Sequence, residues 1–436
     1  MKKLFIYPSL LLAALCLTTA CGDDDNGGTP PPGSGYVASM ETAQQEIESV
    51  GQELAQKIDV EQLKPVITLA EYCERTFLSD EAESVSGWGE TEYPFRSLVR
   101  AMQDCAQGDI ALLASKRDIG DIYQLADLYG KWTWNEEERQ WDQVVDGTPA
   151  RSAIYLFKDE QGNDCEAEIQ GSGQEFVFAR QDSTGYTYSE TVKVPEHLTA
   201  SVKVNGAALA TLTVNTTACD FAARQYAANA SFETSGYRIE ASLNDDDRQA
   251  TFNAVLSGIG GETLVSMQAN AGGRNLADID AIEGNYFDAA SNLHEGNMSC
   301  TILGRLSLQI TADNNSGALA EALDYDGYYW YSTSDSVDYK SIARQEALAA
   351  AEAINQNCTA ALHFNQSSYY VPVTWQSVLY DYSSPGSGYE YGEWSTQPVL
   401  NFEDGTTYTF EQYFTQTRFR SLIAAFEQLG ERFKNL

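Results

Sequence analysis

Apolar side chains recur every three or four positions over residues 37–130, a spacing that places them on one face of a helix. The first such stripe consists of Met40, Ala43, Ile47, Val50, Leu54 and Ile58. Pro65 and Pro94 each stand near the start of a further helix, where proline is tolerated because the first N–H groups have no intrahelical partner. Segment 37–130 is therefore predicted to be a set of antiparallel helices.

Residues 131–340 instead alternate apolar and polar positions, as strands with one buried face do. The strongest hairpin signal is Asn205-Gly206, because both residue types accept the positive φ of a two-residue turn and alternating segments flank them. A second alternating pair flanks the acidic stretch 244–247. This segment is predicted to be a long antiparallel meander.

Residues 341–436 mix both patterns. Helix formers rich in alanine predict a helix over 342–354, Asp404-Gly405 predicts a turn, and Thr409 to Gln412 matches a capping box ahead of a final helix. The apolar face of that final helix would otherwise be exposed, so we expect it to dock on the body. That face consists of Phe419, Leu422, Ile423, Phe426, Leu429 and Phe433.

Together these patterns predict an α+β fold. The N-terminal antiparallel helices are expected to pack on the large antiparallel β-meander, because the apolar face of the sheet needs a cover. Segment 341–436 is expected to belong to the same body, with its C-terminal helix docked on it.

The N-terminus has a different composition. Lys2 and Lys3 precede an apolar run over 4–17 that is short for a membrane span, and small residues then lead to Cys21. This arrangement resembles a bacterial lipoprotein signal. By that resemblance residues 1–20 are a signal peptide that is removed, and Cys21 becomes the first residue, with diacylglycerol on its thiol.

Asp23, Asp24 and Asp25 follow the cysteine closely. An acidic cluster in this place resembles the export tag of surface-exposed outer-membrane lipoproteins of the Bacteroidota. The resemblance implies a protein anchored in the outer membrane and facing the cell exterior. Segment 21–36, rich in proline and glycine, is predicted to be a flexible tether.

The charge of the chain narrows its partners. With 63 acidic and 27 basic residues, the formal net charge is −36. Such a surface repels nucleic acid and anionic headgroups, so we expect no nucleic-acid partner and contact with the membrane through the N-terminal lipid only.

Cysteine and histidine give no motif for chemistry. The cysteines beyond the tether are too sparse for a disulfide-built fold, and burial is favoured for most of them; they are Cys73, Cys105, Cys165, Cys219, Cys300 and Cys358. His197, His294 and His363 are isolated from one another and from other ligand types. The sequence therefore predicts no catalytic residue, no metal and no cofactor.

Aromatic clusters are the best lead to a binding site. Tyrosine and tryptophan offer a flat apolar ring with a polar edge, as ligand sites for ring-shaped molecules do. The run over 328–331 carries rings on both faces of a strand, so burial between a sheet and a helix is the favoured interpretation there and a ligand site the alternative. The candidate ligand-binding residues are Tyr389, Tyr391, Trp394, Tyr329 and Tyr331.

Two short segments concern modification. Asp182-Ser183-Thr184 and Asp335-Ser336-Val337 resemble the acceptor of a general bacterial O-glycosylation system.

Taken together, the sequence favours a lipid-anchored, non-enzymatic surface protein that binds a glycan or a protein partner. The alternatives are a surface hydrolase of the glycosidase type with paired carboxylates, and an accessory structural subunit.

Overall fold

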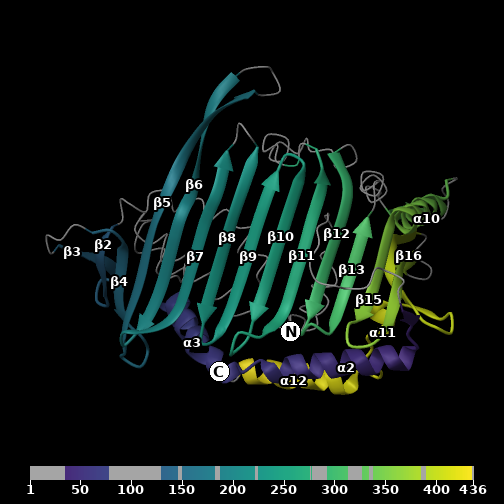
Figure 1. The fold of residues 1–436 in the computed structure, drawn as a ribbon, viewed down its shortest axis with the longest axis horizontal. Coiled ribbons are helices and arrows are strands. Elements are labelled where there is room, and N and C mark those ends of the chain that lie inside the picture. The colour runs from purple at the N-terminus through teal and green to yellow at the C-terminus, as the bar shows by residue number, and fades with distance from the viewer. Residues whose placement is uncertain are drawn as a thin grey trace. The chain divides into compact units, whose positions relative to one another are not determined.

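The fold is described from a computed structural model of the chain (Figure 1). The described residues form five α-helices and a mixed sheet of 18 strands in which most pairings are antiparallel, in agreement with the predicted α+β class. The residues that the structure describes are 35–77, 129–145, 150–181, 187–220, 224–274, 276, 292–312, 327–332, 337–383 and 389–434.

Several sequence predictions fall outside these residues. They are the signal peptide, Cys21 and the acidic cluster, almost all of the tether, the helices expected over 78–128, and both acceptor serines, Ser183 and Ser336.

The chain divides into two compact units, each built from segments distant in sequence. Unit 1 comprises Met1–Ala55, Asp245–Phe252 and Val265–Glu427. Unit 2 comprises Gln56–Asn244, Asn253–Leu264 and Gln428–Leu436.

Unit 2 holds one long helix and a succession of antiparallel strands. Neighbouring pairs are β2–β3, β4–β5, β5–β6, β6–β7 and β7–β8, and β2 also pairs with β4 in parallel. The elements are α3 (Val60–Phe77), β2 (Gly130–Asn135), β3 (Gln140–Val144), β4 (Ala153–Lys158), β5 (Asp164–Gln181), β6 (Thr187–Val204), β7 (Ala207–Asp220) and β8 (Gln225–Thr234).

Phe77, at the end of α3, anchors the helix in the core of unit 2. Its ring lies 4.8 Å from that of Trp134, 5.2 Å from Trp141 and 5.2 Å from Phe157, measured between centroids. The pairs with Trp134 and Phe157 are edge-to-face, a geometry that adds to the free energy gained from burial alone. The apolar face of α3 joins the same cluster through Val66, Leu69, Ala70 and Cys73.

The prediction for Pro65 was wrong in detail. Helix α3 begins at Val60, so the proline lies inside the second turn rather than the first. Proline has no N–H, and the carbonyl of Glu61 therefore loses its intrahelical donor. The apolar stripe predicted for the first helix agrees better with the structure. Helix α2 (Met40–Lys57) buries Ala43, Ile47, Val50 and Leu54, whereas Ile58 lies beyond its end.

The Asn205-Gly206 turn was predicted correctly. Both residues have positive φ, 50° and 79°, and they connect β6 to its antiparallel partner β7. The second predicted hairpin also forms, since β9 (Tyr237–Asp246) pairs with β10 (Gln249–Ser257), although β9 continues through most of the acidic stretch that was expected to turn.

Asp245, near the end of β9, has an unfavourable environment for a charge. Among the described residues its buried Oδ1 has no hydrogen-bond partner. Burial, with the neighbouring carboxylates of Asp246 and Asp247, raises the pKa of Asp245 to about 6.

In unit 1, the strands β11, β12, β13, β15, β16 and β17 are neighbours in that order and antiparallel. Two short strands, β14 and β18, both pair with β17, while β1 (Tyr36–Val37) pairs in parallel with β16. The bounds are β11 (Thr263–Gly273), β12 (Leu293–Ile302), β13 (Leu306–Ala312), β14 (Tyr328–Ser332), β15 (Cys358–Phe364), β16 (Tyr369–Asp381), β17 (Tyr389–Asn401) and β18 (Thr407–Thr409).

Three further helices lie late in the chain: α10 (Tyr339–Asn357), α11 (Phe410–Tyr413) and α12 (Arg420–Lys434). The predicted capping box is present, with Thr409 and Gln412 satisfying each other's backbone N–H groups. It caps α11, however, and the final helix begins separately at Arg420. In unit 1, α12 packs on α2, where Gly51 leaves room for Leu422 (Figure 1).

Most of the cysteines whose burial the structure describes are buried, as predicted, whereas Cys358 is half-buried. Cys73, Cys165 and Cys300 are buried thiols. Burial raises the pKa of Cys300 to about 11, so this thiol stays protonated and unreactive at neutral pH.

Asp404, in the predicted and observed turn before β18, provides a contrast to Asp245. Its Oδ1 accepts hydrogen bonds from the backbone N–H and the hydroxyl of Thr406, at 2.9 and 2.6 Å. These bonds favour the ionised form and lower the pKa of Asp404.

We predict that Asp245→Asn stabilises the protein at pH 7.5 and not at pH 4. The folded-state pKa of Asp245 is raised above its unfolded value, so ionisation destabilises the fold increasingly between the ordinary value of 3.8 and about 6, and the effect is complete above that pH. Removing the charge recovers on the order of 1 kcal/mol at pH 7.5 after allowance for partial exposure. Thermal unfolding at both pH values measures this.

Asp404→Asn is the matched control, because it removes the same charge from a group whose folded-state pKa is lowered. The ionised Asp404 carboxyl stabilises the fold above the pKa of the unfolded state, and this stabilisation is lost on acidification. Asp404→Asn should therefore lower the melting temperature at pH 7.5. Equal shifts in melting temperature for both variants would contradict the view that each effect arises from the local environment of its carboxyl.

Candidate functional site

The aromatic residues of β14, β16 and β17 divide between two faces of the sheet. Successive strand residues point to opposite sides, and residues paired across strands share a side. On β14, Tyr329 is 2% exposed whereas Tyr328 and Trp330 are 54% and 60% exposed. One face of these strands is therefore covered and the other faces solvent.

Helix α10 provides the cover. Its buried residues are almost all alanines, which let the helix backbone approach the sheet closely, and Asp338 caps its first turn by accepting from the N–H of Ser341. Lys340 lies over the ring of Tyr329 and Arg344 over that of Trp394, each 5.5 Å from the centroid. We call this side of the three strands the helix face.

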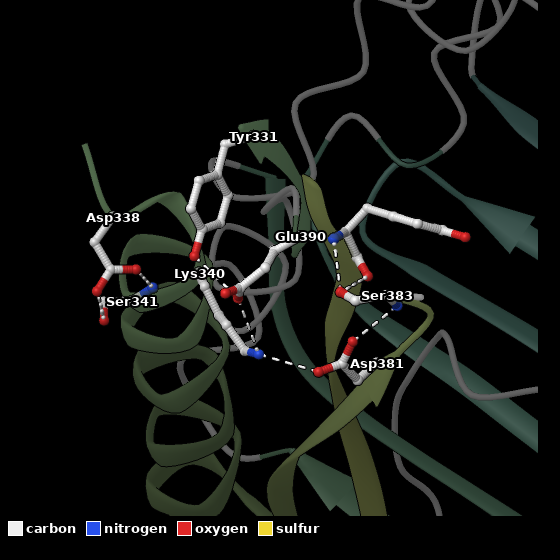
Figure 2. A network of polar contacts seen from close by, with 8 residues as sticks. Tyr331, Asp338, Lys340, Ser341, Asp381, Ser383 and Glu390 are labelled. Carbon is white, nitrogen blue, oxygen red and sulfur yellow. Dashed lines mark hydrogen bonds and ion pairs between the residues drawn. The ribbon is translucent and has the colours of Figure 1, made fainter. Parts of the chain in front are cut away.

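A polar network fixes the start of α10 to the strands, as Figure 2 shows. Lys340 Nζ lies 3.1 Å from Asp381 Oδ2 on β16 and 3.5 Å from Glu390 Oε2 on β17. The hydroxyl of Tyr331 donates to the same oxygen of Glu390 at 3.1 Å. Helix and three strands are thus tied together by a single lysine and its carboxylates.

The environment of this network stabilises the charged forms of Asp381 and Lys340, which does not favour proton transfer at neutral pH. Hydrogen bonds from Ser383, together with Lys340, lower the pKa of Asp381 to about 2. The same bond to Asp381 contributes to raising the pKa of Lys340, against the opposing effect of its burial. Asp381 remains ionised at neutral pH and is unsuited to act as the general acid of a glycosidase, which needs a raised pKa.

Gly392 makes room for the buried tyrosine. A Cβ at this position would lie 2.7 Å from the hydroxyl oxygen of Tyr329 and 2.5 Å from the carbonyl oxygen of Tyr380. Tyr329 and Gly392 are also register partners. Only glycine lets the ring of Tyr329 lie across β17 beneath α10.

The opposite side carries a set of aromatic residues that we call the open aromatic face. Trp330 of β14 and Tyr389 of β17 stack there with their ring centroids 5.3 Å apart and planes 11° from parallel. Tyr389 is 47% exposed. The members of the face are Tyr328, Trp330, Tyr380, Tyr382, Tyr389 and Tyr391.

Register arranges these rings in rows across the strands. Tyr328 pairs with Glu393, which pairs in turn with Tyr380. Trp330 pairs with Tyr391, and the ring of Tyr391 lies 6.4 Å from that of Tyr382. The result is an aromatic surface about three strands wide, or roughly 10 Å between outer strands, in which Tyr380 and Tyr391 are half-buried.

The structure separates the five candidates chosen from sequence. Tyr389 and Tyr391 belong to the open aromatic face. Tyr329, Tyr331 and Trp394 belong to the helix face, where the favoured interpretation, core packing, applies to Tyr329 most clearly.

The five candidates chosen from sequence left out four members of the open aromatic face, Tyr328, Trp330, Tyr380 and Tyr382, although all four lie in the aromatic clusters of the sequence. A signal for two of them was present, because alternation along 328–331 already places Tyr328 and Trp330 on one side and Tyr329 on the other. Tyr328 and Trp330 come to lie beside the rings of β16 and β17 only because β14 pairs with a strand some sixty residues away, as in Tyr331 with Glu390.

Within the part of the chain that the structure describes, no group of three or more His, Cys, Asp or Glu side chains is arranged to hold a metal ion. His363 is buried and stacks on Tyr370, while His197 shares hydrogen bonds with Asn215 and Thr199. The same described residues include no helix long and apolar enough to span a membrane.

Comparisons with known proteins give no match: none was found among protein-family models, curated proteins or solved structures. The function is therefore argued from the geometry of the site.

We predict that Gly392→Ala lowers the free energy of unfolding by about 1–3 kcal/mol, the usual range for overpacking a filled site. The added methyl group must displace either Tyr329 or the backbone of β16. Urea unfolding measures the change, and Gln376→Ala, at an exposed position of β16, serves as the control with an expected effect within about 0.5 kcal/mol. Wild-type stability of the Gly392→Ala variant would contradict the packing described for Tyr329.

Proposed function

We propose that this protein is a lipid-anchored, non-enzymatic surface protein that binds a glycan on its open aromatic face. The observation that carries the proposal is the stacked, solvent-exposed pair Trp330 and Tyr389 on a flat sheet surface. Sugar rings present a face of C–H groups that packs on an aromatic ring, while their hydroxyls reach polar groups at its edge.

Exposure of these rings has a cost in free energy. Burial of apolar surface stabilises a fold by about 25 cal/mol per Å², so a tryptophan and several tyrosines in solvent forgo several kcal/mol. The same strands bury the equivalent rings of their other side under α10. Contiguous exposed apolar surface of this kind typically marks a binding site.

The arrangement favours binding over hydrolysis. Asp381 and Glu390 converge on one group, because both pair with Lys340 on the helix face, away from the exposed rings. A carboxyl with a raised pKa, which a glycosidase acid requires, is found elsewhere, at Asp245. A paired-carboxylate hydrolase therefore has less support.

The location belongs to the same proposal. Cys21 would carry the lipid, and the tether 21–36 would allow the body to stand up to about 5 nm from the membrane, at the extended length of a residue. Asp23, Asp24 and Asp25 would direct the protein to the outer face of the outer membrane. An acidic, lipid-anchored body with an open aromatic face is suited to the capture of extracellular glycans.

The finer architecture is also proposed. The helices near the N-terminus would cover one face of the meander, in keeping with the contribution of α3 to the core of unit 2. The C-terminal helix would dock on the body, in keeping with the contact between Leu422 and Gly51.

We predict that the double variant Trp330→Ala, Tyr389→Ala loses glycan binding. The mature chain, produced without lipid, is screened on a glycan array and its ligands are titrated by calorimetry. Loss of two stacking rings should weaken binding at least about tenfold. The exposed pair Tyr36 and Tyr369 of the same unit, 6.3 Å apart, gives the matched control Tyr36→Ala, Tyr369→Ala, which should retain binding.

Two results would contradict the proposal. Absence of any binding across the array would favour a protein partner instead. Equal losses in both double variants would show that the effect does not belong to the open aromatic face. Circular dichroism of each variant establishes that its fold is intact.

A further inference from the structure

Glu393 is the carboxylate of the open aromatic face. Its register partners on the two flanking strands are both tyrosines, Tyr328 on β14 and Tyr380 on β16. Side chains paired across strands have Cβ atoms about 4.5–5.5 Å apart, so the carboxylate lies between two rings in one row.

The other acids of these strands already have an ion-pair partner. Asp381 and Glu390 pair with Lys340 on the helix face. Glu393 has no ion pair with any residue that the structure describes. A second carboxylate, Glu411 of α11, also lies close enough to act on Tyr380: with burial, Glu411 and Glu393 raise the pKa of that tyrosine.

The three strands of the open aromatic face contribute no positive charge to it. The sequences of β14, β16 and β17 contain no lysine, arginine or histidine. The basic residues of α10 that contact these strands, Lys340 and Arg344, lie on the opposite face. Among the described residues, the face therefore combines aromatic rings with a carboxylate, Glu393, that has no ion pair.

We infer that the ligand of the open aromatic face carries a protonated amine, which binds at Glu393 between Tyr328 and Tyr380. This inference rests on the proposed function and names the class of glycan: an oligosaccharide containing amino sugars with free amines. The ring faces of two tyrosines attract a cation through their quadrupoles, and the carboxylate forms a charge-assisted hydrogen bond with it.

The same arrangement disfavours other glycan classes. Uronic acids and sulfated sugars bring negative charge toward Glu393 and Glu411, and the net charge of −36 adds long-range repulsion. N-acetylated sugars retain the apolar ring face for Trp330 and Tyr389 but have no charge for Glu393. Selectivity for the free amine should thus depend on one carboxylate.

The test compares short oligomers of glucosamine, fully N-acetylated oligomers of the same length, and oligomers of a uronic acid. They are titrated into the mature chain at about 0.15 M salt, where long-range attraction is screened beyond ~8 Å. We expect the free-amine oligomer to bind about tenfold more tightly than the N-acetylated one. We expect Glu393→Gln to bring this ratio close to one.

The control variant is Glu403→Gln, which removes the same charge at an exposed position outside β14, β16 and β17 and should leave the ratio unchanged. If the wild type binds N-acetylated or uronic acid oligomers as tightly as the amine, and Trp330→Ala abolishes that binding, the inference is overturned while the proposed function stands.

A basic peptide, oligolysine, separates the remaining outcomes. If it binds and Glu393→Gln removes its binding while no oligosaccharide binds, the cation site is supported on a protein ligand and glycan binding is overturned. If neither oligosaccharides nor the peptide bind, both the inference and the proposed function are overturned.

Discussion

The packing of α10 on one face of β14, β16 and β17 is the contact on which the rest of this site depends. Because strand side chains alternate, a helix that covers one side leaves the other side for solvent. The alanines of α10, the glycine at position 392 and the ion pairs of Lys340 all serve this single contact. The open aromatic face follows from it, since α10 does not cover these rings: Tyr328, Trp330, Tyr382 and Tyr389 are exposed, and Tyr380 and Tyr391 are half-buried.

Similar types of residue have different roles on the two faces. On the helix face, tyrosine and tryptophan pack beneath cationic side chains, and Asp381 and Glu390 are paired with Lys340. On the open aromatic face, rings of the same types surround a carboxylate with no such pairing among the described residues. The contrast is what makes the exposed side a candidate for binding an external ligand and the covered side a structural contact.

Local patterns in the sequence predicted local structure well. The Asn205-Gly206 turn, the alanine-rich helix and the capping box at Thr409 are set by residues a few positions apart. Helix starts were predicted less well: α3 begins at Val60, ahead of Pro65, and the capping box precedes the short α11 rather than the final helix α12. The site depends on the pairing of β14 with β17 across a long stretch of chain, and no local pattern specifies that register.

The central claim, that alternate rings of β14 lie on opposite faces, is most directly tested by hydroxyl-radical footprinting of the mature chain with peptide mapping by mass spectrometry. The account predicts rapid oxidation of Trp330 and Tyr389 and strong protection of Tyr329, whose ring lies beneath α10. Oxidation of Tyr329 at the rate of Trp330, or protection of both, would contradict the division into a helix face and an open aromatic face.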